Sequence, residues 1–191
     1  MVHRIEAPGR RLRRWMHLLL AAGMTVATAG AAAQPTQVII VRHAERAPVP
    51  GDDPPLAPEG LQRAELLADL LVAVPVGAVI TTQYRRTQET AAPLLRRTGL
   101  VPVQMRIRRG EVPAHIEEVV AAVRQASGVV LVVGHSNTVP GIVAGLSASR
   151  PMAICETTFS NLFVLTPALP SVPAVQLKYG RPDVPPHAGC Q

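Results

Sequence analysis

Short apolar runs alternate along the chain with longer segments in which apolar residues recur every three or four positions. The short runs are Val38–Val41, Ala78–Thr81, Leu100–Gln104, Val129–Val133, Asn161–Leu165 and Ala174–Lys178. The longer segments are Glu59–Val74, Tyr84–Arg97, Pro113–Gln125 and Val139–Leu146. The runs are typical of buried strands, and the periodic segments are typical of helices that pack by one face. Strands alternating with helices predict a mostly parallel sheet covered on both faces, a three-layer α/β/α sandwich.

The segments between these elements carry the expected breaking residues. Ala47–Pro58 contains five prolines and reads as a loop, and Gly99 stands where a helix-terminating glycine belongs. Ala57 occupies the N-cap position of the first helix, where its lack of a capping side chain should cost about 1 kcal/mol. The expected apolar face of that helix is Leu61, Ala64, Leu67, Ala68 and Leu71.

The third predicted helix has an apolar stripe and one histidine near its start. The stripe consists of Ile116, Val119, Val120 and Val123. His115 stands beside Glu117 and Glu118, which favours a solvated position at the rim of the domain.

Polar side chains follow three of the predicted strands at their carboxyl ends. Arg42 and His43 follow the first strand, Thr82–Arg86 follow the second, and His135–Asn137 follow Val129–Val133. Open α/β sheets bind ligands outside the carboxyl ends of their strands, so we expect these groups to converge. Two Arg and two His with few acidic neighbours form an anion site, and guanidinium groups match phosphate oxygens in a bidentate manner. The sequence therefore predicts a phosphate site.

Three of these blocks resemble the signature sequences of one family, the histidine phosphatase superfamily with its phosphoglycerate mutase-like fold. Val41–Glu45 resembles the R-H-G-E signature, and Leu56–Gly60 is similar to the L-T-x-x-G turn. Thr82–Ala91 resembles S-P-L-x-R-A-x-x-T-A, which aligns Arg86 with the second phosphate-binding Arg. Val133–Asn137 resembles the V-G-H-x-x block that holds the second His.

The resemblance covers about residues 38–165 and preserves the order and spacing of the motifs. Ala44, Ala57 and Gln83 depart from the family pattern, but none of them removes a side chain that the chemistry needs. Within the family, the chain resembles the short-chain branch.

The resemblance implies a metal-independent, two-step phosphoryl transfer without a cofactor. His43 would displace the alcohol and become phosphorylated, and water would then hydrolyse the phosphohistidine. Arg42, Arg86 and a protonated His135 would offset charge on the phosphoryl oxygens. The substrate-binding set implied in this way is Arg42, Arg86, His135, Ser136 and Asn137.

The leaving oxygen needs a proton, usually from a carboxyl group. Glu111 follows Arg86 at about the distance at which the short-chain branch carries its acid, so we assign the proton donor there. Glu45 and Glu156 are the other candidates. For Glu45 we favour a structural partner of Arg42, Arg46 or Arg86, and for Glu156 a charge at a strand edge.

Functions of other classes were compared with the phosphatase prediction. A metal hydrolase would use His43, Glu45 and His135 as ligands, but there is no H-E-x-x-H sequence or carboxylate-rich cluster. Nucleotide-binding glycine motifs are missing as well. A noncatalytic phosphate-binding or interaction module on the same fold and a phosphomutase remain the alternatives to an exported phosphatase.

The first 33 residues resemble a cleavable targeting segment. Five arginines precede an apolar stretch, Leu18–Ala33, that ends in three alanines before Gln34. We therefore expect a signal peptide over residues 1–33, a periplasmic or secreted protein, and no stable membrane anchor after cleavage. Removing five Arg and one Glu from 19 basic and 13 acidic residues leaves 14 and 12, a net charge of +2. This small excess predicts no nucleic-acid partner.

The remaining residues, 34–191, are enough for a single domain, with a Pro-rich tail over 179–191. The expected partner is a small phosphorylated substrate or a phosphoprotein. The sequence leaves the oligomeric state open, and it leaves open whether Cys155 and Cys190 form a disulfide.

Overall fold

The computed structural model describes residues 1, 3 and 34–184, and within them a six-stranded sheet has the order β3-β2-β4-β1-β5-β6. Strands β3, β2, β4 and β1 are parallel, β5 is antiparallel to β1, and β6 is antiparallel to β5. The strands are β1 Pro35–Arg42, β2 Val76–Thr81, β3 Val103–Gln104, β4 Gly128–Gly134, β5 Asn161–Leu165 and β6 Val175–Lys178. The predicted, mostly parallel sheet is confirmed.

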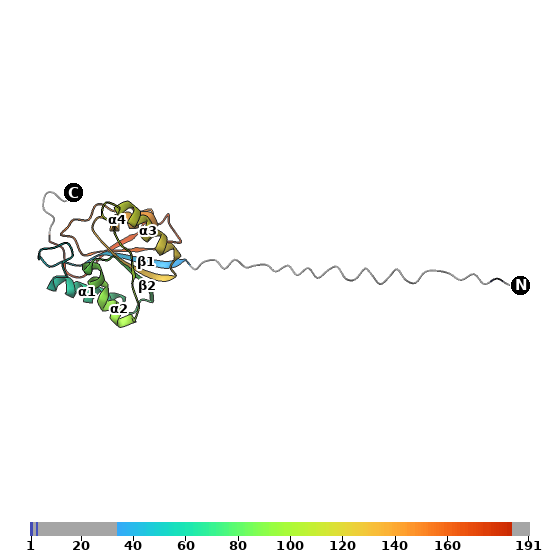
Figure 1. Ribbon diagram of the computed structural model, residues 1–191, viewed down its shortest axis with the longest axis horizontal. Helices are drawn as coiled ribbons and strands as arrows, with labels where there is room; N and C mark the ends of the chain where they lie inside the picture. Colours follow the sequence, from blue (N-terminus) through green and yellow to red (C-terminus); the bar gives the residue numbers. More distant parts are fainter. Residues whose placement is uncertain (2, 4–33, 185–191) are drawn as a thin grey trace. The chain divides into compact units, whose positions relative to one another are not determined.

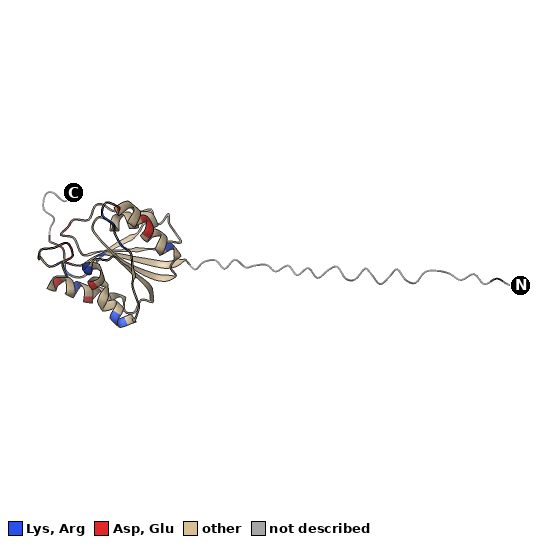
Figure 2. Ribbon diagram, in the orientation of Figure 1, with Lys and Arg blue, Asp and Glu red and all other residues tan. Residues whose placement is uncertain are grey.

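Helices cover both faces of the sheet, so the predicted three-layer architecture is confirmed as well (Figure 1). Helices α1 and α2 lie on one face, and α3 and α4 lie on the other. The helices are α1 Pro58–Leu71, α2 Arg85–Thr98, α3 Val112–Gln125 and α4 Val139–Leu146. Figure 2 shows that Lys, Arg, Asp and Glu lie mainly on the helices and loops, whereas the strands are largely uncharged.

The central position of β1 in the sheet explains why its sequence is apolar without interruption. Successive side chains of a strand point to opposite faces. Val38 and Ile40 therefore pack with the α3/α4 layer, and Ile39 and Val41 pack with the α1/α2 layer. Because both faces are covered by helices, no position of β1 between 38 and 41 can be polar without losing core contacts.

Helix α1 buries a face that differs by one position from the predicted one. Ala64, Leu67, Ala68 and Leu71 are buried, but Leu61 is 52% exposed. The buried face begins at Gly60, and successive residues of a helix are rotated by about 100°, so Leu61 is turned toward solvent. A Cβ on Gly60 would overlap with the carbonyl oxygen of Glu45. Gly60 therefore lets α1 lie directly against the backbone that follows β1.

The start of α3 corrects a second prediction. His115 is only 2% exposed, whereas we expected it at the solvated rim. It lies one helical turn before Val119, and residues four apart share a helix face, so His115 belongs to the buried stripe. Glu117 and Glu118 lie at other angles around the helix, so their charge does not indicate whether His115 is exposed.

The first residues of the predicted Pro-rich tail pack against the domain. Tyr179 is buried and donates its backbone N–H to Ser160, while its carbonyl accepts a 2.7 Å hydrogen bond from Arg63. Asp183 accepts hydrogen bonds from the backbone N–H groups of Phe159 and Ser160. Packing thus continues beyond the last strand.

Several predictions concern residues outside the described part. They include the signal peptide, except for residues 1 and 3, and the tail from residue 185 onward with Cys190. Cys155 is disulfide-bonded. Among the described residues, no helix combines the length and apolar character that a membrane crossing requires.

Candidate active site

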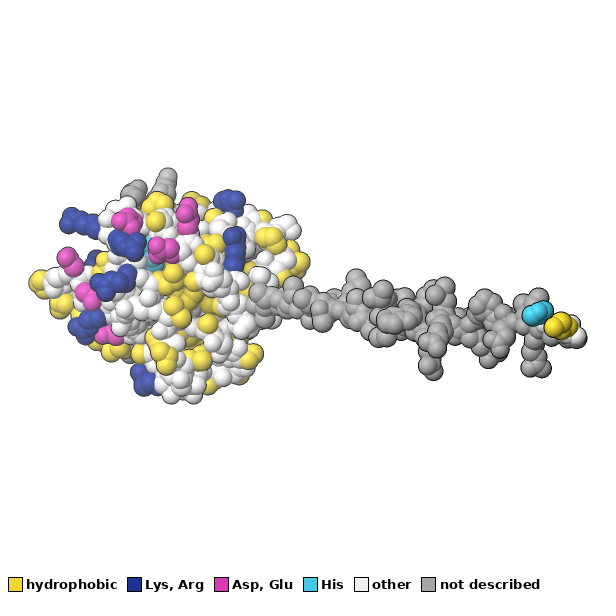
Figure 3. Space-filling model, turned by 45° about the vertical axis from the view of Figure 1, so that its right-hand side comes forward, with side chains coloured by type: hydrophobic (Ala, Val, Ile, Leu, Met, Phe, Trp, Pro, Cys, Tyr) yellow, Lys and Arg dark blue, Asp and Glu magenta, His cyan; other side chains and the backbone are white. Residues whose placement is uncertain are grey.

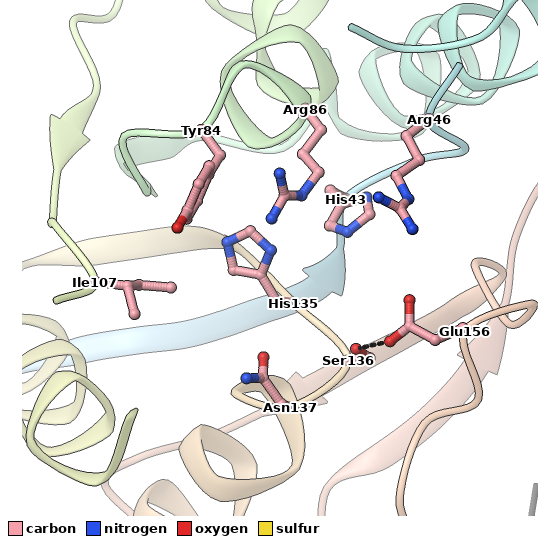
Figure 4. Close-up of a pocket in the computed structure, with 9 residues that line it drawn as sticks. All are labelled: His43, Arg46, Tyr84, Arg86, Ile107, His135, Ser136, Asn137 and Glu156. Carbon is pink, nitrogen blue, oxygen red and sulfur yellow. Dashed lines mark hydrogen bonds between the residues drawn. The ribbon is translucent and has the colours of Figure 1, made fainter. Parts of the chain in front are cut away.

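A cavity of about 330 Å³ opens at the carboxyl ends of the parallel strands. It is lined by His43, Arg46, Tyr84, Arg86, Ile107, His135, Ser136, Asn137 and Glu156 (Figure 4). The two histidines lie beyond β1 and β4, and Arg86 comes from the first turn of α2. Figure 3 shows a histidine side chain between basic and acidic side chains on this face. The cavity is therefore polar, with both signs of charge at its mouth.

His43 is held in one orientation by the backbone on either side of it. Its N–H donates to Gly134 at 2.9 Å, which ties the end of β1 to β4. Its Nδ1 lies 2.8 Å from the carbonyl oxygen of Ala44. Since a carbonyl can only accept, Nδ1 carries the proton and Nε2 keeps a free lone pair. Burial lowers the pKa of His43 to about 3, so the imidazole is neutral at ordinary pH.

His135 faces His43 across the cavity, with ring centroids 5.3 Å apart. Its Nε2 lies 3.0 Å from the hydroxyl of Thr82, and its ring meets Tyr84 edge-on. Burial, followed by the positive field of neighbouring groups, lowers the pKa of His135 to about 2. The predicted imidazolium therefore requires a bound anion, whose negative charge would raise this pKa.

Arg86 and its neighbour Arg85 point in different directions. The side chain of Arg86 is 15% exposed, lines the cavity and lies 4.2 Å above the Tyr84 ring. Its guanidinium lies 3.8 Å from Asp53. The side chain of Arg85 is 56% exposed and pairs with Glu89 one turn further along α2. Of these two arginines, only Arg86 lines the cavity and is placed to meet an anion there.

Arg42 lies behind the cavity wall. Its side chain is 1% exposed, and it is not among the described residues that line the cavity. Nη1 donates to the carbonyls of Cys155 and Thr158, and the guanidinium stacks 4.3 Å from the Phe159 ring. Nη2 donates to Glu156 at 2.7 Å, while Nε is buried without a partner within residues 34–184. The guanidinium thus fixes the 155–159 loop.

The three candidate carboxyl groups lie in three different places. Glu111 precedes α3, is half-exposed, pairs with Arg108 and does not line the described cavity, so the structure does not bring this predicted proton donor to the other site residues. Glu45 pairs with the buried Arg63 at 2.7 Å and with none of the three arginines expected. The reason is that α1 packs against the Glu45 backbone and brings Arg63 to it.

Glu156 lines the cavity, which corrects its interpretation as a strand-edge charge. It lies in the loop before β5 and accepts hydrogen bonds from Arg42 and from the hydroxyl of Ser136 (Figure 4). Burial raises its pKa, but the Ser136 hydrogen bond and the Arg42 charge outweigh burial and hold the pKa below its ordinary range. Without a ligand, Glu156 is a carboxylate.

Comparison with known proteins accords with this geometry. Residues 38–113 match the model of the histidine phosphatase superfamily (branch 1). These 76 of the 191 residues include His43 and Arg86. A comparison with curated proteins finds no match.

Several solved structures share the fold. One is the protein histidine phosphatase SixA complexed with tungstate, with a TM-score of 0.58 and 23% identity over 74% of this chain and 96% of that chain. Another is phosphoglycerate mutase from Bacillus anthracis, with a TM-score of 0.56 and 14% identity over 75% and 94%. A third is mycobacterial glucosyl-3-phosphoglycerate phosphatase, with a TM-score of 0.54 and 16% identity over 69% and 90%.

Some of the cavity residues were not identified from the sequence. Arg46 lies three positions after His43 and could have been found from that spacing. Tyr84 and Ile107 carry no such sign, because they reach the cavity through the turns before α2 and α3. Ser136 and Asn137 line the cavity next to His135. Among the described residues, no group of three or more His, Cys, Asp or Glu could hold a metal ion.

Proposed function

We propose that this protein is an exported, metal-independent phosphatase that hydrolyses phosphomonoesters or phosphohistidine through a phosphohistidine on His43. The match of residues 38–113 to the histidine phosphatase superfamily supports phosphatase or mutase chemistry in general. The observation that carries the finer proposal is the hydrogen bond from His43 Nδ1 to Ala44, which leaves Nε2 as the free nitrogen in a cavity containing Arg46, Arg86 and His135. A neutral imidazole with a fixed lone pair is the form that attacks phosphorus.

The first step transfers the phosphoryl group to the protein. Nε2 of His43 forms a bond to phosphorus as the bond from phosphorus to the leaving atom breaks, and the leaving atom takes the electron pair and a proton. Arg86 and His135, which line the cavity, offset the charge of the phosphoryl oxygens. In the second step water adds to phosphorus, the P–N bond breaks, and inorganic phosphate departs.

Glu156 is our proposed proton donor in place of Glu111. It is the carboxyl group among the three candidates that lines the cavity. A phosphoryl dianion beside it would raise its pKa, because a like charge disfavours the ionised carboxylate. Glu156 would then be protonated when the substrate is bound and would donate that proton to the leaving atom in the first step. As a carboxylate it could then accept a proton from the attacking water in the second step.

The two alternatives differ from hydrolysis in measurable ways. A phosphomutase would move the phosphoryl group between hydroxyls of one molecule, and a noncatalytic module would bind phosphate without turnover. The fixed lone pair of His43 and the cationic side chains around it support turnover over a noncatalytic module.

The deciding experiment incubates the purified protein, in the presence of EDTA, with a panel of phosphomonoesters, phosphoglycerate isomers and a phosphohistidine peptide. We expect phosphate release by the wild type and none by His43→Asn. Loss of activity in EDTA that returns with added metal would contradict the metal-independent reaction. Isomerisation without phosphate release would favour the mutase, and tight phosphate binding without either reaction would favour the noncatalytic module.

Export is a separate part of the proposal, motivated by the basic and apolar segments of residues 1–33. N-terminal sequencing of the protein recovered outside the cytoplasm should begin near Gln34. An intact N-terminus on a protein retained in the cytoplasm would contradict export and leave the enzymatic proposal untouched.

A further inference from the structure

Two buried threonine hydroxyls form a chain that ends at His135. Thr82 Oγ1 lies 3.0 Å from His135 Nε2 and 3.0 Å from Thr87 Oγ1. The exposed fractions of these residues are 2% for Thr82, 0% for Thr87 and 5% for His135. Water is therefore largely excluded, and the direction of each hydrogen bond is set by the groups themselves.

The direction follows from counting protons, starting at Thr87. Its hydroxyl has one proton, which it donates to the backbone carbonyl of Tyr84 at 2.9 Å. Its oxygen accepts the backbone N–H of Thr82 at 3.1 Å, and its second lone pair faces the Thr82 hydroxyl. Thr87 can also donate to the carbonyl of Thr82 at 3.3 Å. Assigning its proton to these backbone carbonyls, which can only accept, makes Thr82 the donor to Thr87. Thr82 Oγ1 can then only accept from His135.

We propose that Thr82 and Thr87 are positioning residues that keep a proton on Nε2 of His135, so that Nδ1 presents a lone pair to the cavity. Figure 4 shows the second ring nitrogen of His135 directed toward Arg86 and His43. The carbonyl of Tyr84 terminates the chain, since it can accept but not donate. A fixed backbone group thus sets the tautomer of His135 through two side chains.

The consequence concerns the substrate's protonation state, and this step rests on the proposed function. A phosphoryl monoanion can transfer the proton of its P–OH group to Nδ1, giving an imidazolium beside a dianion. The imidazolium then donates from Nδ1 to the phosphoryl group and from Nε2 to Thr82. Without a neutral Nδ1, no such transfer occurs. The bound pair is stabilised by charge-assisted hydrogen bonds.

The groups around His135 explain why the extra proton must arrive with the anion. His43 and Arg42 face it from the end of β1, Arg86 from α2 and His115 from α3. Burial, together with the positive charges of Arg86 and Arg42, disfavours the imidazolium until a phosphoryl dianion offsets it.

The tautomer is measured directly by 15N NMR of the imidazole nitrogens in uniformly labelled protein. The His135 signals are identified by their loss in His135→Asn. We expect a protonated Nε2 and an unprotonated Nδ1 between pH 6 and 8, and a proton on both nitrogens after orthovanadate is added. A protonated Nδ1 in the free wild type would overturn the proposal without any further variant.

Thr82→Val tests the hydrogen-bonded chain from His135 through Thr82 and Thr87, which we call the relay. Thr81→Val is the matched control. Thr81 is the preceding residue, is 1% exposed, and its hydroxyl has no partner among the described residues. Thr82→Val places a methyl group against Nε2, so we expect the proton to move to Nδ1, where it can be hydrated. Loss of the acceptor for imidazolium should lower kcat/KM about ten- to a hundredfold. Thr82→Ser should restore both the tautomer and the rate.

Wild-type spectra and rates in Thr82→Val would overturn the proposal, as would an equal effect of Thr81→Val. If Thr82→Val does not fold, Thr82→Ser and the wild-type spectrum still decide, because both depend only on the retained hydroxyl. The NMR measurement needs no turnover. An Nε2–H tautomer in a protein that hydrolyses nothing would uphold the relay and reject the phosphatase, and the reverse result would reject the relay alone.

Discussion

Arg42 and Glu156 are 114 positions apart in the sequence, yet Nη2 of Arg42 donates to Glu156 at 2.7 Å. The guanidinium is buried, whereas the carboxylate side chain is 68% exposed and lines the cavity. Because Arg42 also holds the carbonyls of Cys155 and Thr158, the loop before β5 is fastened to the end of β1. This contact delivers a carboxyl group to the phosphate site.

Glu156→Gln should slow the enzyme in proportion to how much the leaving group needs a proton. The amide keeps the shape and a hydrogen bond to Ser136 but cannot donate a proton. General acid catalysis typically contributes about 10²- to 10⁴-fold. We expect a loss of about 10²-fold or more with alkyl phosphates and little loss with p-nitrophenyl phosphate, measured as kcat/KM against leaving-group pKa. Glu111→Gln is the control and should match the wild type. A selective effect of Glu111→Gln would restore our first assignment.

Arg86→Ala should be far more damaging than Arg85→Ala. Arg86 lines the cavity, and removing a donor to transition-state charge from such a site costs roughly a hundredfold or more in kcat. Arg85 loses only an exposed pair with Glu89, worth less than about 1 kcal/mol of stability. Steady-state kinetics of the two variants check this. The opposite order of effects would mean that the side chain meeting the phosphate is assigned one position too far along α2.

His43, not His135, should carry the phosphoryl group. The Nδ1 proton of His43 is fixed by Ala44, and its pKa of about 3 keeps Nε2 unprotonated in mildly acidic solution. Rapid quenching with a 32P-labelled substrate, followed by peptide mapping at alkaline pH, locates the label. We expect it on the peptide containing His43, and less of it in His135→Asn because that variant forms it more slowly. A label on the His135 peptide or on a serine would contradict the assignment.

The free energy of unfolding should fall as the solution is made acidic. Burial places the folded-state pKa of His43 near 3 and that of His135 near 2, below the ordinary value of 6.5. The unfolded state therefore binds more protons. The stabilisation is fully present above pH 6.5 and is lost as the pH falls from there toward 3. Each histidine contributes a slope of at most about 1.4 kcal/mol per pH unit.

Urea unfolding at several pH values measures this slope. The variant His43→Asn/His135→Asn should unfold with a shallower pH dependence between pH 6.5 and 4 than the wild type does. Equal slopes in the two proteins would show that the histidines titrate normally in the folded state.

Gly60→Ala should impair folding and activity together. The new Cβ would overlap with the carbonyl oxygen of Glu45 and lie 3.0 Å from its carbonyl carbon, so α1 or the segment after His43 must move. Overpacking of this kind costs about 1–3 kcal/mol. Thermal unfolding and kcat/KM are the measurements, and Gln62→Ala, at an exposed position of the same helix, is the control. A Gly60→Ala protein with wild-type stability would show that this approach of α1 is not required.

Much of the fold and the core of the site could be predicted from local sequence. The apolar runs of β1 and β4 indicate strands buried on both faces, and the Arg42-His43 and His135-Ser136 blocks at their ends indicate where ligands bind. These features depend on near neighbours in the chain, which periodicity and motif spacing report. The short strand β3 was overextended as Leu100–Gln104, since only Val103 and Gln104 pair with β2.

Other features could not be predicted because they depend on contacts between distant segments. His115 was placed at the rim because its neighbours are acidic, but the angle of α3 buries it. Glu45 finds Arg63 only because Gly60 lets α1 approach so closely. The carboxyl group in the cavity is Glu156 and not Glu111, because Arg42 holds the loop before β5.

The sequence by itself determined the layers of the fold, the strand ends at which the site forms and the pair of histidines with Arg86. The physical reason is that burial and backbone preference repeat along the chain with the period of each element. Only the tertiary structure decided which carboxyl group enters the cavity, that Arg42 lies behind its wall, and that Thr82 and Thr87 connect His135 to a backbone carbonyl. Hydrogen bonds and ion pairs of this kind depend on atomic positions within a few tenths of an ångström, and such positions are fixed by packing of residues that are remote in sequence.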